Sequence, residues 1–234
     1  MILCIETATS LCSVALCDNN AVLSLKESNE GRSHASLLTL FIQDLLHEAG
    51  ISVADLDAVA VSKGPGSYTG LRIGVSAAKG IAYAASLPLI GIETTFSMFH
   101  GFYDYIKGKY TFTSYDLFCP LLDARRMEVY SAVFNHEGKI VRNLKAEIMT
   151  NESFSEYPES SRIFLFGDGA EKCKDVIKRQ NIIYESGYNI SASSMCKPAS
   201  EALSERDFED VAYFEPFYLK DFLTSKPVKN VLGN

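Results

Sequence analysis

The feature that most restricts the fold of this chain is a glycine-rich turn between a short apolar strand and a long helix. Three glycines and a proline fall within residues 64–70. Residues 56–62 before the turn are mostly apolar, and the pattern after it predicts a helix over about Ser67–Ser86. In an open α/β sheet, turns at the carboxyl ends of strands are where ligands and partners usually meet the fold. The turn therefore predicts an α/β chain whose functional surface lies close to it.

The spacing of the turn allows two interpretations. A P-loop needs a lysine and a second glycine at fixed offsets, and the dinucleotide fingerprint needs a glycine where Thr69 stands, so neither pattern is met. Backbone N–H groups behind an N-cap at Ser67 still offer a weak anion site. Small residues then recur at helical spacing: Gly70, Gly74, Ala77, Ala78, Ala82 and Ala85. We favour close packing as the role of the turn, with phosphate binding as the open alternative.

The order of elements indicates the fold class. Strands with short connections are predicted first, at Met1–Glu6, Cys12–Cys17 and Ala21–Leu25. A helix at His34–Ala49 follows and ends at Gly50 as its C-cap. The strand before the turn, the helix after it and a strand at Pro88–Ile92 complete a β-β-β-α-β-α-β unit. This order is typical of the actin, sugar-kinase and Hsp70 superfamily, so we expect an α/β chain with an actin-like ATPase, ribonuclease H-like fold.

The second half loosely echoes the first, which predicts two tandem subdomains. We place the boundary in the aromatic, turn-rich segment 94–113 and expect an N-terminal actin-like subdomain at 1–108 and a C-terminal one at 109–234. Further strands are predicted at Leu117–Leu122, Glu128–Phe134, Lys139–Ile148 and Arg162–Phe166. Helices are predicted at Ala170–Gln180 and near Ser200–Arg206, and the tail after Lys220 is expected to fray.

Length and charge narrow the function classes. The 234 residues suit one large domain or two small ones. The net charge is −7, whereas a protein that grips nucleic acid alone normally has a basic face, so contact with RNA is expected to be indirect or weak. No apolar run reaches the roughly 18 residues of a membrane span, and Met1–Glu6 lacks the basic start of a signal peptide. A cytoplasmic protein without membrane contact is expected.

The cysteines show no metal-ligand spacing. They are Cys4, Cys12, Cys17, Cys119, Cys173 and Cys196, with no CxxC pair, and most lie in apolar runs. Reduced thiols buried in the core are the expectation, in preference to disulfides or a metal site.

The sequence contains no motif for hydrolytic or metal-dependent catalysis. The histidines have no partners at ligand spacing, and no HExxH or G-x-S-x-G pattern occurs. Glu6 ends the first strand, where the actin-like superfamily usually places an aspartate that orients a metal-bound water. Asp168 lies between two glycines, which suits a second phosphate loop or, more simply, a turn. The charged connection at 123–130 is either a salt-linked surface turn or a recognition loop.

Several segments together resemble the TsaB (YeaZ) family. They are Ile5–Thr9, Gly64–Gly74, Pro88–Ile92, Leu122–Tyr130 and Glu215–Lys220, and the resemblance runs over most of residues 1–220. The family-motif residues are Glu6, Thr7, Gly64, Pro65, Gly66, Ser67, Tyr68, Gly70, Asp123 and Arg125. The resemblance implies a subunit required for N6-threonylcarbamoyladenosine at position 37 of ANN-decoding tRNAs. It also implies that this subunit binds the catalytic paralogue TsaD and works with the ATPase TsaE.

The resemblance further implies a non-catalytic scaffold, a pseudoenzyme. The two metal-binding histidines of TsaD match Thr94 and Met98 of this chain, and both residue types are poor ligands for such an ion. No metal and no cofactor are therefore expected. The alternative is a stand-alone metal- or nucleotide-dependent hydrolase or peptidase of the glycoprotease type. That enzyme needs either a phosphate cradle at Glu6–Ser10 together with Gly167–Gly169 or a metal site.

Two helices are predicted to bind the TsaD paralogue. The helix His34–Ala49 is apolar over a wide arc, which is typical of a helix buried on two sides. The predicted partner interface consists of His34, Leu37, Leu38, Phe41, Ser67, Gly70, Arg72, Gly74, Ala77 and Ala78. A homodimer through the same surface is expected when the chain is alone, because an isologous patch is easily reused.

Overall fold

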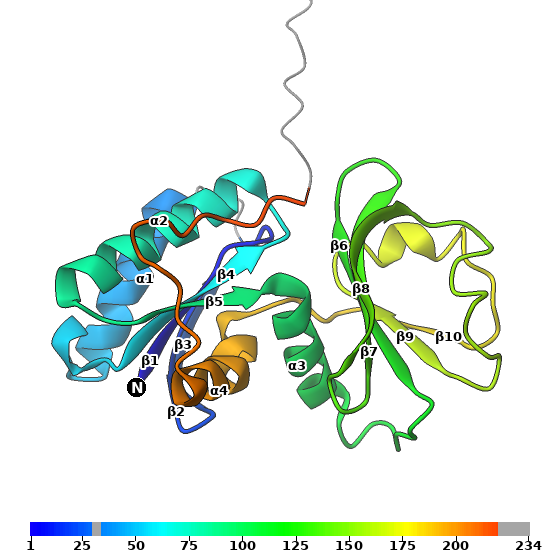
Figure 1. Cartoon of the computed structure of the whole chain (residues 1–234), viewed down its shortest axis with the longest axis horizontal. Coiled ribbons are helices and arrows are strands. Elements are labelled where there is room, and N and C mark those ends of the chain that lie inside the picture. Colours follow the sequence, from blue (N-terminus) through cyan, green and yellow to red (C-terminus); the bar gives the residue numbers. More distant parts are fainter. Residues whose placement is uncertain (30–33, 220–234) are drawn as a thin grey trace, which may run out of the picture.

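The chain folds into two lobes, each built on a five-stranded sheet (Figure 1). The computed structural model describes residues 1–29 and 34–219, so the tail after Lys220 lies outside the described residues. The first sheet has the order β3-β2-β1-β4-β5. Its strands are β1 (Ile2–Glu6), β2 (Cys12–Asp18), β3 (Ala21–Ser28), β4 (Ala58–Gly64) and β5 (Leu89–Glu93). The first three strands pair antiparallel, and β4 and β5 join in parallel. Along the chain the elements follow the predicted β-β-β-α-β-α-β order.

The second sheet repeats this topology. Its strands are β6 (Leu117–Asp123), β7 (Glu128–Asn135), β8 (Ile140–Ile148), β9 (Ile163–Phe166) and β10 (Ile182–Glu185). They lie in the order β8-β7-β6-β9-β10, with β6, β7 and β8 antiparallel and β9 and β10 added in parallel. Two copies of one mixed-sheet pattern confirm the predicted actin-like, ribonuclease H-like α/β fold.

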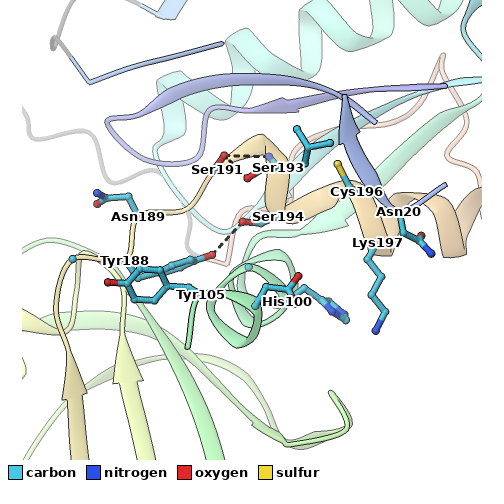
Figure 2. Close-up of a pocket in the computed structure, with 14 residues that line it drawn as sticks. Asn20, His100, Tyr105, Tyr188, Asn189, Ser191, Ser193, Ser194, Cys196 and Lys197 are labelled. Atoms are coloured by element: carbon cyan, nitrogen blue, oxygen red, sulfur yellow. Dashed lines mark hydrogen bonds between the residues drawn. The ribbon is translucent and has the colours of Figure 1, made fainter. Parts of the chain in front are cut away.

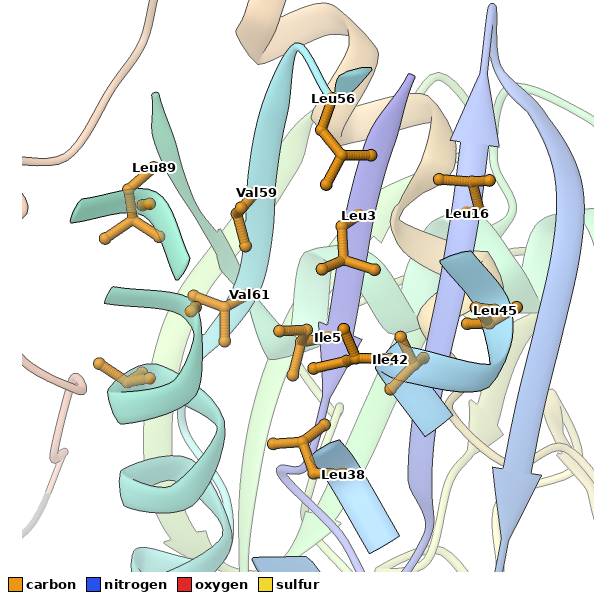
Figure 3. Close-up of a cluster of buried hydrophobic side chains, with 14 of the residues drawn as sticks. Leu3, Ile5, Leu16, Leu38, Ile42, Leu45, Leu56, Val59, Val61 and Leu89 are labelled. Atoms are coloured by element: carbon orange, nitrogen blue, oxygen red, sulfur yellow. The ribbon is translucent and has the colours of Figure 1, made fainter. Parts of the chain in front are cut away.

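Two helices cover one face of the first sheet. In α1 (His34–Glu48), the apolar residues Leu38, Ile42 and Leu45 recur at helical spacing and face Leu3, Ile5 and Leu16 on the strands (Figure 3). Gly50 ends this helix with φ +68°, as its predicted C-cap role requires. Helix α2 (Tyr68–Ala85) packs beside α1 on the same face. Among the described residues, no helix has the length and apolar character needed to cross a membrane.

Each of two further helices follows a strand of one lobe and packs on the sheet of the other lobe. Helix α3 (Thr94–Ile106) follows β5 but packs on the second sheet, where Phe102 stacks on Phe166 with ring centroids 3.7 Å apart. Helix α4 (Cys196–Glu205) follows β10 and packs on the free face of the first sheet. The division at residue 108 stays a prediction. The packing also shows that the chain returns to the first lobe after residue 190.

Some secondary-structure predictions were wrong. The segment 94–113 was expected to be rich in turns, but α3 occupies residues 94–106 because its aromatic residues recur at helical spacing and are buried together. The predicted helix Ala170–Gln180 is a short 3₁₀ turn followed by further turns, in which most hydrogen bonds span three residues. Strand β10 was missed, and α4 begins at Cys196 rather than near Ser200. Pro198 is compatible with that start because it falls in the first turn of α4.

The expectation that all cysteines are reduced was also wrong. Cys17 on β2 and Cys196 on α4 form a disulfide, with their Cα atoms 5.4 Å apart. The pair is separated by 179 residues, so no local spacing pattern reveals it. Cys4, Cys12, Cys119 and Cys173 are free and buried, as expected.

Candidate functional site

The glycine turn is pressed against the loop that joins β1 to β2. A Cβ atom added to Gly66 would lie 2.5 Å from the carbonyl oxygen of Ala8, and one added to Gly70 would come closer still to that of Thr7. A Cβ at Gly74 would overlap Thr7 Oγ1. Cβ contacts this short do not occur in real proteins, so each of these positions requires glycine as it stands. Gly64 adds a left-handed backbone, with φ +114°.

Hydrogen bonds fix the start of α2 to the same loop. The Ser67 N–H donates to the Ala8 carbonyl oxygen at 2.6 Å, and the Gly70 N–H donates to Ser67 Oγ at 3.2 Å. Ser67 is therefore the N-cap that the sequence predicts. These two N–H groups point into the chain itself, so they are not offered to an anion. The geometry favours the packing interpretation of the turn over a phosphate loop.

A terminal strap, residues 209–219, covers the other side of the turn. It runs along the first lobe as the orange-to-red segment of Figure 1. The Phe217 N–H donates to the Lys63 carbonyl oxygen at 2.6 Å, next to the turn. The ring of Tyr218 lies 4.8 Å from that of Tyr68, and Arg72 Nε donates to its hydroxyl oxygen at 3.3 Å. The glycine motif and the described part of the Glu215–Lys220 motif are thus neighbours in space, although nothing in either segment signals the contact.

The predicted interface residues fall into two groups. Leu38 and Ala78 are buried against their own sheet, and Gly70 and Gly74 are buried against the β1–β2 loop, so none of the four can touch a partner directly. Their side chains or close backbone contacts instead set the position of α1 and α2. For these residues, helical spacing indicated a contact face but not whether the contact lay inside the chain.

The other predicted interface residues reach the surface. Ser67 and Arg72 are exposed, and Leu37, Phe41 and Ala77 are half-buried. His34 is also half-buried, and its Nε2 lies 3.0 Å from the carbonyl oxygen of Thr9, which anchors the start of α1. Sequence reasoning missed Leu40, which is 52% exposed, and Ile73. We call Leu37, Leu40, Phe41, Ile73 and Ala77 the helix-pair surface.

Glu6 is fully buried at the end of β1. Its Oε1 accepts hydrogen bonds from the Ala8 N–H at 2.6 Å and the Ser62 hydroxyl at 2.7 Å, while Oε2 has no partner among the described residues. Burial raises the pKa of Glu6 to about 7, against the lowering effect of those hydrogen bonds. Within the described part of the chain, the one cluster of potential metal ligands is formed by cysteines and does not include Glu6. The carboxyl group thus holds the β1–β2 loop that supports the glycine turn.

The charged connection after β6 is a salt-linked turn. Lys172 Nζ pairs with Asp123 Oδ1 and donates to the carbonyl oxygen of Glu128 at 2.6 Å. The Asp123 N–H donates to Asp168 Oδ1 at 3.0 Å, and burial raises the pKa of Asp168. Arg125 is exposed and takes a left-handed backbone, with φ 70°. Of the two interpretations left open by the sequence, the contacts favour the salt-linked turn, in which Asp168 is a structural residue.

A cavity of about 550 Å³ lies between the lobes. Figure 2 shows side chains from α3, from the segment 187–197 and from the β2–β3 hairpin converging on it. Tyr188 and Ser194 are hydrogen bonded at 3.2 Å, and burial lowers the pKa of His100 to about 4, so the imidazole is neutral. His100 Nε2 has no partner in the described residues and activates no serine there. None of the site residues predicted from the sequence lines this cavity.

The two positions that the resemblance is expected to match to the metal-binding histidines of TsaD are inside the protein. Thr94 and Met98 are both buried on α3. Met98 Cε would overlap a Cβ atom added to Gly167, so this side chain packs tightly on the second sheet. The hydroxyl oxygen of Thr94 has no hydrogen-bond partner among the residues described. Neither residue presents a donor group to the cavity between the lobes.

Comparison with known proteins places the chain in a family. The family model described as "TsaD: tRNA N6-adenosine threonylcarbamoyltransferase" matches residues 26–214. A transferase of that name from Halalkalibacterium halodurans is 41% identical over 109 residues, covering 40% of this chain and 32% of the relative. The solved structure of YeaZ from Pseudomonas aeruginosa has a TM-score of 0.76 and 23% identity, covering 93% of this chain and 99% of that one, which shows the same fold.

A resemblance over nearly the full length links the chain to a protein from Escherichia coli (strain K12). That protein, named "tRNA threonylcarbamoyladenosine biosynthesis protein TsaB", is 31% identical over 229 residues, which cover 94% of each chain. A protein of the same name from Bacillus subtilis (strain 168) is 25% identical and covers 94% of this chain. With the duplicated fold, the glycine turn and these matches in place, the chain belongs to the TsaB family, a branch of the TsaD-type proteins.

Proposed function

We propose that this chain acts in the biosynthesis of threonylcarbamoyladenosine in tRNA as a non-catalytic subunit that binds a TsaD-type paralogue. Membership of the TsaB family supports the role in this modification. Thr94 and Met98, which the resemblance matches to the metal-binding histidines of TsaD, are buried, and this supports a subunit without its own transferase site. No metal or cofactor is part of the proposal.

The helix-pair surface is the observation that carries the scaffold role. Leu37, Phe41, Ile73 and Ala77 are only partly covered by the core cluster beneath them, and Leu40 projects beside them. Apolar side chains along two adjacent helices suit the packing of two further helices by ridges into grooves. We infer that the corresponding helices of the paralogue cover this surface and complete a helical bundle.

The same proposal includes four secondary expectations. A second copy of the chain covers the helix-pair surface when the paralogue is absent, because an isologous patch can pair with itself. TsaE joins the full complex. Contact with tRNA is indirect or weak, because a net charge of −7 repels the phosphate backbone, and the complex works in the cytoplasm.

Co-purification with the TsaD-type paralogue tests the surface. Leu40→Glu places a charge in the expected contact and should weaken the complex at least tenfold, because burying an unpaired carboxylate is costly. Leu23→Glu, on the edge strand β3, is the matched control, since Leu23 is 55% exposed and Leu40 52%. Equal retention of the paralogue by both variants would show that the helix-pair surface is not the interface.

Two measurements test the function itself. Restoring this chain to cells that lack their own TsaB-type protein should restore threonylcarbamoyladenosine in tRNA, as measured by mass spectrometry of nucleosides. Calorimetry of the isolated chain with ATP and a divalent ion should show no tight binding. Tight stoichiometric binding would contradict the non-catalytic role and favour the stand-alone hydrolase or peptidase.

A further inference from the structure

Three cysteines from distant parts of the sequence converge on one face of the first sheet. Cys4 lies on β1 opposite Ala15 of β2, and Cys17 follows two residues later on β2, so the two side chains share a face. Cys196 is the first residue of α4, which packs on that face. The three sulfur atoms lie within 4.8 Å of one another, and all three residues are buried.

Small side chains allow this close approach. The surrounding cluster contains Ala15, Ala58, Ala60, Ala192 and Ala199. With so little bulk between them, α4 and the sheet approach until the Cα atoms of Cys17 and Cys196 are 5.4 Å apart. That separation lies inside the range of about 4.4–6.8 Å that a disulfide can span.

We propose that Cys17 and Cys196 are a reversible redox site that fastens α4 to the first sheet, with Cys4 as an adjoining thiol to which the bond can transfer. The oxidant is a low-molecular-weight disulfide of the glutathione class. The proposal is independent of the function argued above, because it rests on the positions of these sulfur atoms and uses no residue of the helix-pair surface.

The cavity between the lobes is the route by which the oxidant reaches Cys196. Cys196 lines that cavity, as Figure 2 shows, whereas Cys4 and Cys17 do not. The thiolate of Cys196 attacks the small disulfide, so that a mixed disulfide forms and one small thiol leaves. The thiolate of Cys17 then attacks Cys196 Sγ, and the second small thiol leaves. The protein loses two electrons and two protons, and the small disulfide becomes two thiols.

Cys4 is placed for exchange within the protein. Its Sγ lies 3.6 Å from Cys17 Sγ. Attack by a Cys4 thiolate on Cys17 Sγ forms a Cys4–Cys17 bond and releases Cys196 as a thiolate, which takes up the proton that Cys4 lost. No electrons are exchanged with solution in that step. Burial raises the pKa of Cys4 to about 12, so near neutral pH its thiol is protonated and exchange from the Cys17–Cys196 bond is slow.

Reduction acts on the wall of the cavity. Cys196 and Lys197 begin α4, and both line the cavity with the preceding serines. The disulfide ties this segment covalently to β2, while α3 packs against it from the other side. Breaking the bond leaves only noncovalent packing to hold the segment, so reduction should loosen the cavity wall and lower the stability of the first lobe.

Thiol counting on the full chain tests the site directly. The protein is treated with glutathione disulfide, alkylated in denaturant and mapped by mass spectrometry. We expect four alkylated cysteines and one peptide pair linked through Cys17 and Cys196, and six alkylated cysteines after dithiothreitol. Six alkylated cysteines after the oxidant, or Cys4–Cys17 as the main link, would overturn the proposal.

Thermal unfolding supplies a second readout. Dithiothreitol should lower the Tm of the oxidised protein by roughly 5–15 °C, as expected for losing a long-range cross-link. Cys17→Ser removes both bonds named above and should abolish that shift, whereas Cys12→Ser should keep it, because Cys12 is a buried free thiol on the same strand as Cys17 but outside the cluster. The Tm shift of the parent protein can be measured even if a variant fails to fold. An unchanged Tm of the parent after addition of dithiothreitol would refute the redox site.

Discussion

Gly70 shows what the glycines of the turn contribute at the scale of one residue. The position that its Cβ would take is already filled by the carbonyl oxygen of Thr7, so α2 can lie this close to the β1–β2 loop only without a side chain there. Gly80 lies in the same helix, yet a Cβ there would meet nothing within 4 Å. The two positions look alike in the sequence and differ only in their surroundings.

A pair of alanine substitutions separates these two glycines. Gly70→Ala should lower the free energy of unfolding by roughly 1–3 kcal/mol, because the backbone of Thr7 must move to admit the new methyl group. Gly80→Ala should raise it by about 0.5–1 kcal/mol, because alanine favours the helix and nothing obstructs it. Urea unfolding measures both, and equal effects of the two changes would contradict the packing role of the turn.

At the scale of elements, the terminal strap fixes α2 and the glycine turn from outside. Lys79 Nζ on α2 donates to the carbonyl oxygen of Phe214 at 2.7 Å, and Glu209 pairs with Leu89 on the edge strand β5. The helix-pair surface depends on the position of α2, so the strap contributes indirectly to the proposed interface. This gives the aromatic family motif near the carboxyl end a structural role.

Tyr218 is the residue through which the strap can be tested. Tyr218→Ala removes the ring that packs on Tyr68 and should cost about 1–2 kcal/mol of unfolding free energy, measured in urea. Tyr218→Phe keeps the ring and loses only the bond from Arg72, so its effect should be smaller. Tyr213→Ala is the control, because Tyr213 is 85% exposed and should be close to neutral. A loss at Tyr213 as large as that at Tyr218 would argue against the strap.

At the scale of the whole molecule, two buried groups give opposite dependences of stability on pH. The pKa of Glu6 is raised to about 7, so between its unfolded value near 4.5 and 7 the folded state keeps a proton that the unfolded state loses. The contribution of Glu6 to the free energy of unfolding therefore falls as the pH rises through that window. The pKa of His100 is lowered to about 4, so its contribution rises from about pH 4 to about pH 6.5.

Glu6→Gln isolates the first of these contributions. The difference in unfolding free energy between the parent and the variant should shift by about 3 kcal/mol against the parent from pH 4.5 to pH 7, and stay constant above that. The amide oxygen of the new side chain can still accept the bonds now given by Ala8 and Ser62. Urea unfolding at a series of pH values gives the two curves, and parallel curves would show that Glu6 titrates normally in the folded state.

The fold was largely predictable because its signals are local. Alternating and apolar runs indicated nine of the ten strands found in residues 1–29 and 34–219, and Gly50 and Ser67 marked helix ends by their own conformational preferences. The exceptions lack such signals. Three of the four residues of β10 are only half-buried, whereas the equally short β9 is buried throughout. The aromatic residues of α3 suggest turns until the second sheet supplies the surface that buries them.

The candidate site was predictable only in part. Helical spacing identified the contact-making residues of α1 and α2 but not the direction each one faces. Gly74 and Ala78 therefore proved to be core residues, while Leu40 was overlooked on the surface. The direction in which a helix side chain faces depends on which sheet the helix covers. That packing is a property of the assembled lobe.

The sequence by itself determined the order of the first five strands along the chain, the glycine turn and the family. Each of these depends on residue types and short spacings, which act before the chain has folded. Only the tertiary structure decided that α3 and α4 exchange lobes, that the terminal strap covers the turn, and that Cys4, Cys17 and Cys196 meet. Those contacts join segments far apart in the chain, and such pairs are selected by the burial of whole faces rather than by any local preference.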